Sequence, residues 1–348
     1  MKKRTRILTV CIALVMILSV FTACGANGGG NNAANNNSSN TVVEKQTIHF
    51  ASTVQNTMPA GAACKYFCDL INERSGGRYE VVYHPGGELG QTDELLTNVM
   101  SGTLEIAQIS TSNISAYTNV LECVQYPFQL PTYAKEKAAF QSDEFKAIMN
   151  EVDIALGVHN LIIMEHGARH FANNLRPITK PADAEGIKLR ASTTKTNLAI
   201  LEAIGINPVS LSYGQVYSAL QSKTIDGEEI NFTSVYSEKH YEVLKYFTDM
   251  QLWPFPAMMM MSEKFWTSLS AEDQAMFTQA AQDAFEYNFQ LLDEATDNAR
   301  KTMQENNVEI TVIEDNSEFA AIAKPFIDKA IENNKLAQDF IKMCENLK

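Results

Sequence analysis

The sequence is poor in cysteine, has more acid than base, and contains only one long apolar run. Six cysteines among 348 residues, none spaced as a CxxC pair, argue against a disulfide-stabilised scaffold and a structural zinc site. The formal net charge of −13 argues against a nucleic-acid partner, because phosphate-binding proteins usually carry a basic surface. With 45% hydrophobic residues and enough length for two average domains, the chain is expected to be globular.

The motifs of several enzyme classes are also absent, namely GxSxG, HExxH, the Walker A loop and GxGxxG. His166 and His170 have the spacing HxxxH, but Gly167 stands where a metalloprotease needs Glu. An exported hydrolase that uses His84, Glu88 or His166 as general acid or base is an alternative, but the sequence offers no nucleophile and base to go with it. We therefore predict no catalytic residue, no metal site and no cofactor.

The first 23 residues combine a basic start, an apolar stretch and a small-residue end. They hold four of the 28 basic residues and none of the 41 acidic ones, so the remainder has a net charge of −17. This pattern predicts a secretory signal peptide over residues 1–23. Because Cys24 follows directly, the segment resembles a bacterial lipoprotein signal, which implies that Cys24 becomes the new N-terminus and carries palmitate-type acyl chains. An uncleaved anchor, or a plain signal with an incidental Cys, is the alternative.

Residues 24–46 predict a lipid-anchored flexible linker. Its Gly, Asn and Ser residues cannot bury a core, and about 20 such residues reach roughly 25 Å on average. No later segment has 18 uninterrupted apolar residues, so none is expected to span a bilayer. We expect an exported, acidic body held at the outer face of the cytoplasmic membrane, or on the periplasmic side in a cell with two membranes.

From residue 47 onward, short strand-like segments alternate with helix-like ones. Strands separated by helices of ten or more residues predict an α/β fold with largely parallel sheets. The expected strands are 47–52, 78–84, 106–109, 161–164, 187–190, 208–212 and 308–313. The expected helices are 58–74, 91–100, 194–204, 213–221, a long one over 277–306, and 318–347.

Three segments resemble the solute-binding proteins of TRAP transporters, the C4-dicarboxylate-binding family. Residues 84–107 read HPGGELGQTDELLTNVMSGTLEIA, and residues 263–274 read EKFWTSLSAEDQ. Between them, residues 167–231 contain GARHFANNLRPITKPADAEGIKLRAS, then GINPVSLSYGQVYSALQ and DGEEIN. These motifs follow the family's order, and the resemblance extends over roughly residues 47–345.

The resemblance implies a two-lobed periplasmic-binding-protein fold with hinge strands and a long helix that spans both lobes. Lobe I is expected to comprise residues 47–166 and about 255–295, and lobe II residues 167–254 and about 296–348. A small organic acid would bind between the lobes and be delivered to the membrane subunits of a TRAP transporter. A receptor for an ABC or tripartite-tricarboxylate importer is the nearest alternative, but the order of motifs favours a TRAP protein.

By position in the motif, Arg190 matches the family's carboxylate-binding arginine, and Arg169 matches a second arginine that contacts ligand. A planar guanidinium grips a carboxylate through two parallel hydrogen bonds, which lysine cannot do. The alternatives are a surface salt bridge for Arg190 and, for Arg169, an ion pair that frames the cleft.

Four further positions match ligand-contacting residues of the family. Tyr213 corresponds to an aromatic residue of the pocket, although core packing is an alternative for it. Thr193 corresponds to a polar contact three residues after the arginine, and Gln91 and Ser110 correspond to contacts from the first lobe.

The sequence departs from the family pattern after Gly227. The usual run Asp-Gly-Gln-Glu-Asn-Pro is here Asp-Gly-Glu-Glu-Ile230-Asn231, so the Asn that commonly holds the ligand is Ile230. Either Asn231 takes its place through a local shift, or the contact is lost. The identity of the organic acid therefore does not follow from the resemblance.

Overall fold

The computed structural model describes residues 45–347. The predicted signal peptide, the lipidated Cys24 and all but two residues of the predicted linker lie outside this range. Within residues 45–347, no helix combines the length and the apolar character needed to cross a membrane.

The first sheet has five strands in the order β2-β1-β3-β10-β4. β1 pairs in parallel with β2 and β3, whereas β10 runs antiparallel to β3 and β4. The strands are β1 (Gln46–Ala51), β2 (Tyr79–His84), β3 (Ile106–Ser110), β4 (Val158–Glu165) and β10 (Pro256–Ser262).

The second sheet has six strands in the order β11-β9-β5-β8-β6-β7. β5 is antiparallel to β8 and β9, and the other pairs are parallel. The strands are β5 (His170–Asn173), β6 (Lys188–Arg190), β7 (Asn207–Val209), β8 (Gly227–Ile230), β9 (Tyr246–Asp249) and β11 (Glu309–Val312). The expected α/β fold is confirmed, but both sheets are mixed, because β5 and β10 each begin where the chain has crossed from the other sheet.

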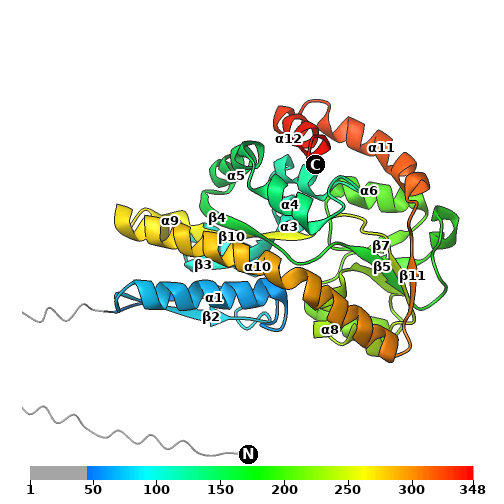
Figure 1. The fold of residues 1–348 in the computed structure, drawn as a ribbon, viewed down its shortest axis with the longest axis horizontal. Coiled ribbons are helices and arrows are strands. Elements are labelled where there is room, and N and C mark those ends of the chain that lie inside the picture. Colours follow the sequence, from blue (N-terminus) through cyan, green and yellow to red (C-terminus); the bar gives the residue numbers. More distant parts are fainter. Residues whose placement is uncertain (1–44, 348) are drawn as a thin grey trace, which may run out of the picture. The chain divides into compact units, whose positions relative to one another are not determined.

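Helices flank both sheets (Figure 1). The α-helices are α1 (Pro59–Arg74), α2 (Thr92–Ser101), α3 (Thr111–Ile114), α4 (Tyr133–Phe140), α5 (Asp143–Leu156), α6 (Lys195–Ile204), α7 (Val216–Gln221), α8 (Phe232–Ser237), α9 (Glu263–Trp266), α10 (Ala271–Glu305), α11 (Ser317–Ile331) and α12 (Lys335–Glu345). The 3-10 helices are η1 (Val120–Gln125), η2 (Pro181–Ala184), η3 (Tyr213–Gln215) and η4 (His240–Glu242). The single helices expected over 213–221 and 318–347 are therefore each divided in two.

The long helix α10 has 35 residues and contacts elements of both sheets. Ser270 caps it by accepting a hydrogen bond from the backbone N–H of Asp273, and two acidic residues in the first turn favour the positive end of the helix dipole. The helix packs against α1 and β4 near the first sheet and then against α8 and β11 near the second (Figure 1). This is the lobe-spanning helix that the resemblance implied.

Two short segments carry the chain between the sheets, and we call residues 166–169 and 250–255 the crossover segments. The backbone N–H of Arg169 donates to the Trp253 carbonyl at 2.7 Å, and the N–H of Leu252 donates to the Arg169 carbonyl at 2.8 Å. At the end of β4, the Glu165 backbone exchanges two hydrogen bonds with the side chain of Asn288 in α10. The two crossover segments and α10 are the three connections between the sheets. Hydrogen bonds therefore join the two crossover segments to each other and join α10 to the end of β4.

The C-terminal helices divide their contacts between the two parts of the molecule. α11 packs against α6, which lies beside the second sheet. α12 packs against α5, α4 and η1, beside the first sheet. The lobe boundaries remain a prediction, and the position of α12 shows that residues 335–345 also contact the expected lobe I.

Candidate functional site

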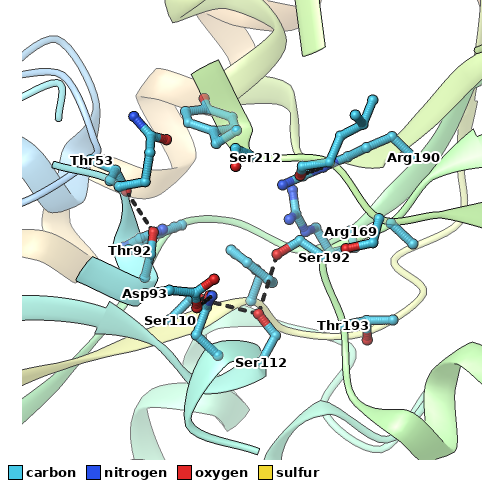
Figure 2. Close-up of a pocket in the computed structure, with 18 of the residues that line it drawn as sticks. Thr53, Thr92, Asp93, Ser110, Ser112, Arg169, Arg190, Ser192, Thr193 and Ser212 are labelled. Carbon is cyan, nitrogen blue, oxygen red and sulfur yellow. Dashed lines mark hydrogen bonds between the residues drawn. The ribbon is translucent and has the colours of Figure 1, made fainter. Parts of the chain in front are cut away.

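A cavity of about 440 Å³ lies between elements of the two sheets. Residues after β1 and β3 and in the first turn of α2 line one side, and residues after β6 and β7 line the other (Figure 2). Serine and threonine form the largest group among its lining residues. The cavity therefore offers many hydroxyl groups that can both donate and accept hydrogen bonds.

The structure places all six predicted ligand-binding residues around this one cavity. The lining residues include Arg190, Arg169, Tyr213, Thr193, Ser110 and Gln91. The last two come from the side of the first sheet, and Arg169 comes from a crossover segment. Their roles in ligand binding remain predictions.

Arg169 is buried and forms an ion pair with Glu229. Its Nε lies 2.7 Å from Oε1 of Glu229, although the N–H is not aligned for a hydrogen bond. Its guanidinium carbon lies 3.5 Å from the centre of the Phe255 ring, a cation–π contact made across the crossover segments. The ion pair considered for Arg169 is thus present, and the residue lines the cavity as well.

Arg190, at the end of β6, is only 4% exposed and has no ion-pair partner within residues 45–347. Its Nε donates to the Leu211 carbonyl at 3.2 Å, and its Nη1 has no hydrogen-bond partner among the described residues. Burial and the nearby charge of Arg169 lower the pKa of Arg190, but a guanidinium stays protonated in proteins. The alternative of a surface salt bridge is therefore wrong, and the cavity contains a buried cation without a counter-ion.

The two carboxylates beside Arg190 already have other partners. Glu229 pairs with Arg169 and accepts hydrogen bonds from the Ser192 backbone N–H at 3.1 Å and the Trp253 indole at 3.1 Å. Glu228 lies 2.6 Å from Nδ1 of His240. Burial opposes protonation of His240, but the charge and hydrogen bond of Glu228 outweigh it and raise the pKa of His240. The charges of both carboxylates also favour the protonated form of Arg190, but neither carboxylate forms an ion pair with it.

The hydroxyl of Tyr213 is buried and has no hydrogen-bond partner in residues 45–347, while its ring centre lies 5.9 Å from the Arg190 guanidinium carbon. Burial raises the pKa of Tyr213, so its hydroxyl remains a donor. Thr193 accepts a hydrogen bond from Asn197 at 3.0 Å and can still donate its own proton.

Neither Ile230 nor Asn231 lines the cavity. Ile230 is fully buried in an apolar cluster with Val216 and Leu220. Asn231 caps α8, where its carbonyl oxygen accepts a hydrogen bond from the Ser234 backbone N–H at 2.8 Å. Asn231 therefore does not line the cavity, whereas Ser234 does.

The sequence analysis missed several cavity residues. Ser112 and Ser192 approach each other across the cavity, with their hydroxyl oxygens 3.3 Å apart (Figure 2). Asp93 follows two positions after Gln91, and Phe255 comes from the second crossover segment. Ser192 and Asp93 could have been found from their closeness to predicted residues, but Phe255 reaches the cavity through a long-range contact without a local signal.

A second cavity of about 270 Å³ adjoins the same crossover segments, and we call it the rear cavity. Ala168 and His170 line it, whereas His166 and Arg169 line the first. Glu136 of α4 also lines the rear cavity and is 1% exposed. Within the described residues, no group of three or more His, Cys, Asp or Glu side chains is arranged to hold a metal ion.

Comparison with known proteins agrees with this architecture. The family model for bacterial extracellular solute-binding protein family 7 matches residues 50–334. The 2,3-diketo-L-gulonate-binding periplasmic protein YiaO of Escherichia coli K12 is 25% identical over 306 residues, which cover 87% of this chain and 92% of that protein. The C4-dicarboxylate-binding periplasmic protein DctP of Shewanella loihica is 27% identical over 240 residues, covering 69% and 71%.

A solved structure with the same fold is a TRAP periplasmic solute-binding protein from Bordetella bronchispeptica, whose bound density was assigned to pantoate. It has a TM-score of 0.82 and 25% identity, and the match covers 87% of this chain and 99% of that one.

Proposed function

The chain belongs to the bacterial extracellular solute-binding proteins of family 7, the TRAP type, and from this premise we propose how its cavity is used. The cavity between the sheets captures a small organic acid, with Arg190 as the main carboxylate-binding residue and Arg169 as the second. The protein then delivers the acid to the membrane subunits of a TRAP-type transporter. Tyr213, Thr193, Ser110 and Gln91 complete the contacts to the ligand.

The observation that carries this proposal is the unpaired charge of Arg190. A buried cation without a counter-ion is costly, and a ligand carboxylate would supply both the missing charge and a partner for Nη1. Each charge-assisted hydrogen bond contributes about 1.5–3 kcal/mol. The ligands of the related proteins also support an acid, because 2,3-diketo-L-gulonate, C4-dicarboxylates and pantoate all contain carboxylates.

We propose that binding is accompanied by closure of the two lobes about the crossover segments. The Ser112–Ser192 contact joins opposite sides of the cavity, and Thr57 makes a similar contact with Ser237 at 2.9 Å. Such contacts between exposed or partly buried hydroxyl groups are weak singly and can break when the lobes separate. In the closed state, contacts between the ligand and both lobes would contribute more to stability than these hydroxyl contacts do.

Residues 1–23 and Cys24 would export the protein and anchor it to the membrane by lipid, with residues 25–46 as the tether. The net charge of −17 beyond residue 23 does not conflict with an anionic ligand, because the local field at two arginines differs from that of the whole protein.

An exported hydrolase has less support. Of the three residues considered for that role, only His166 lines the cavity. Burial and Arg169 lower the pKa of His166 to about 3, so its imidazole is neutral. No serine, threonine or cysteine side chain within residues 45–347 forms a hydrogen bond with its ring, so it has no nucleophile to activate.

The test is a thermal-shift screen of the mature protein against organic acids, followed by chromatography of each mixture. A ligand present at 100 times its dissociation constant stabilises the folded state by about 2.7 kcal/mol. We expect at least one carboxylate to raise the melting temperature while remaining chemically unchanged. A product in the chromatogram, or no stabilisation by any carboxylate, would contradict the proposal.

A further inference from the structure

Asp93 gives the cavity a negative end opposite its arginines. The residue lies in the first turn of α2, is exposed, and lines the cavity. Figure 2 shows Asp93 on the side of Ser110 and Thr92, across the cavity from Arg190 and Arg169. The two arginines and the Asp93 carboxylate therefore lie on opposite sides of the cavity, and a second exposed carboxylate, that of Glu202 in α6, also lines it.

The Asp93 carboxylate is held in place from one side only. Its Oδ1 accepts a hydrogen bond from Nδ2 of Asn113 at 2.6 Å, and Oδ1 of Asn113 in turn accepts one from the Ser110 hydroxyl. No side chain or backbone N–H within residues 45–347 donates to Oδ2, and no Lys or Arg of this range forms an ion pair with it. Because α2 is a ten-residue helix, the positive end of its dipole also favours a negative charge in its first turn.

An ionised carboxylate can only accept hydrogen bonds, so a ligand must offer a donor at this end. A second carboxylate on the ligand would meet a like charge there, which disfavours binding. We propose, on the basis of the proposed function, that Asp93 restricts the cavity to hydroxylated acids with a single carboxylate and excludes the corresponding dicarboxylates. The carboxylate of the ligand would lie at Arg190 and Arg169, and a ligand hydroxyl would donate to Oδ2 of Asp93.

A ligand ammonium group could also donate to Asp93, but the rest of this end favours hydroxyl groups. The hydroxyl oxygens of Thr53 and Thr92 lie 3.3 Å apart, and those of Ser110 and Ser112 lie 3.0 Å apart. These groups donate as well as accept, which matches ligand hydroxyls that do the same, whereas an ammonium can use acceptors only.

The test compares acids that differ only at the end away from the carboxylate. Galactonate and galactarate share six carbons and their internal hydroxyls, but galactarate has a second carboxylate in place of the terminal alcohol. Erythronate and meso-tartrate form the same pair with four carbons, and 4-hydroxybutyrate and 4-aminobutyrate compare a terminal hydroxyl with an ammonium. Calorimetric titration of the mature protein gives an affinity for each acid.

We expect the wild-type protein to bind at least one hydroxylated monocarboxylate about 100-fold or more tightly than its dicarboxylate partner. Asp93→Asn keeps an oxygen acceptor but removes the charge, so it should narrow this ratio by about tenfold, or about 1.4 kcal/mol. The matched control is Glu151→Gln, which makes the same charge change on the exposed part of α5 and should leave the ratio unchanged.

The other possible results overturn either the role of Asp93 or the proposed function. If wild type binds dicarboxylates as tightly as their partners, or if Asp93→Asn leaves the ratio unchanged, the role of Asp93 is overturned while the proposed function stands. Tighter binding of 4-aminobutyrate than of 4-hydroxybutyrate would overturn the preference for hydroxyl groups. If no organic acid binds at all, the proposed function itself fails and this inference fails with it.

Discussion

The cavity lined by Arg169 and Arg190 and the rear cavity adjoin the same crossover segments, but the buried ionisable groups beside them differ. A cation is buried beside the first cavity, and two carboxyl groups are buried beside the second. In the first, Arg190 is a buried cation that forms no ion pair within residues 45–347. Beside the second, the carboxyl groups of Glu136 and Glu165 are both buried, and Oε2 of each lacks a hydrogen-bond donor in the described part of the chain. Arg190 can be paired by the carboxylate of a ligand, whereas two neighbouring carboxyl groups can avoid repulsion by sharing a proton. The first arrangement suits ligand binding, and the second suits a permanent structural contact.

The position of Glu165 explains why such a contact is useful. Its Oε1 accepts hydrogen bonds from the backbone N–H groups of Gly167 at 2.8 Å and Phe255 at 3.0 Å, one in each crossover segment. Burial raises the pKa of Glu165 to about 7, and burial together with the charge of Glu165 raises the pKa of Glu136. At neutral pH the two carboxyl groups therefore retain at least one proton between them, which avoids the repulsion between two buried negative charges.

Replacing Arg190 should have the largest effect, because it removes the uncompensated charge. Loss of two charge-assisted hydrogen bonds of about 1.5–3 kcal/mol each predicts that Arg190→Ala weakens ligand affinity by about 10²–10⁴-fold. Calorimetric titration with the best ligand of the screen measures this effect. The apo protein should stay folded, because the substitution also removes a buried charge.

Arg190→Lys and Arg74→Ala serve as controls for this prediction. Lysine keeps the charge but not the planar pair of donors, so an affinity between wild type and Arg190→Ala is expected. Arg74 forms an ion pair with Asp283 away from the cavity, and its replacement should not change binding. Wild-type affinity in Arg190→Ala would show that the unpaired cation is not what binds the ligand.

Glu229→Gln removes the ion-pair partner of Arg169, so that neither arginine of the cavity has one among the described residues. Breaking a buried ion pair by removing one partner costs about 3–5 kcal/mol, so urea unfolding should show a less stable apo protein. The ligand carboxylate then faces two unpaired cations, and the ligand-induced rise in melting temperature should be larger than in wild type. A smaller rise would mean that Glu229 positions Arg169 for the ligand more than it competes with it.

The rear pair should respond to pH rather than to ligand. The folded-state pKa of Glu165 is raised from 4.5 to about 7, so its contribution is fully present below pH 4.5 and is lost as the pH rises through about 7. This loss amounts to roughly 3 kcal/mol. Glu165→Gln, which cannot ionise, should show a weaker decline in stability between pH 5 and pH 8 when urea unfolding is compared at each pH.

The comparison with the variant at each pH matters because buried histidines change stability in the opposite direction. Burial lowers the pKa of His166 to about 3 and of His170 to about 4. Stability from these groups is present above their unfolded pKa of about 6.5 and is lost as the pH falls. If Glu165→Gln declines as steeply as wild type between pH 5 and pH 8, the pair does not share a proton in the way described.

The alternation of strand-like and helix-like segments predicted the α/β class, whereas the six cavity residues were predicted by matching the motifs of the family. Arg190 ends β6 and Thr193 follows three residues later, so one local motif identified both. Phe255 could not be predicted, because it meets Arg169 only through the pairing of two crossover segments distant in sequence. Asn231 shows a second limit, since the sequence does not reveal that its carbonyl oxygen is used to cap α8.

Tyr213 should give the smallest effect and separates binding from packing within the cavity. Its hydroxyl is buried and forms no hydrogen bond within the part of the chain that the structure describes, so Tyr213→Phe should not lower the stability of the protein without ligand. If the hydroxyl donates to the ligand, affinity falls by about 0.5–1.5 kcal/mol, which corresponds to roughly two- to tenfold. Tyr217→Phe is the matched control, because Tyr217 donates to Glu242 at 2.8 Å outside the cavity and its loss should leave affinity unchanged. Equal affinity in Tyr213→Phe and wild type would assign Tyr213 to core packing, and Arg190 would then act without help from this side chain.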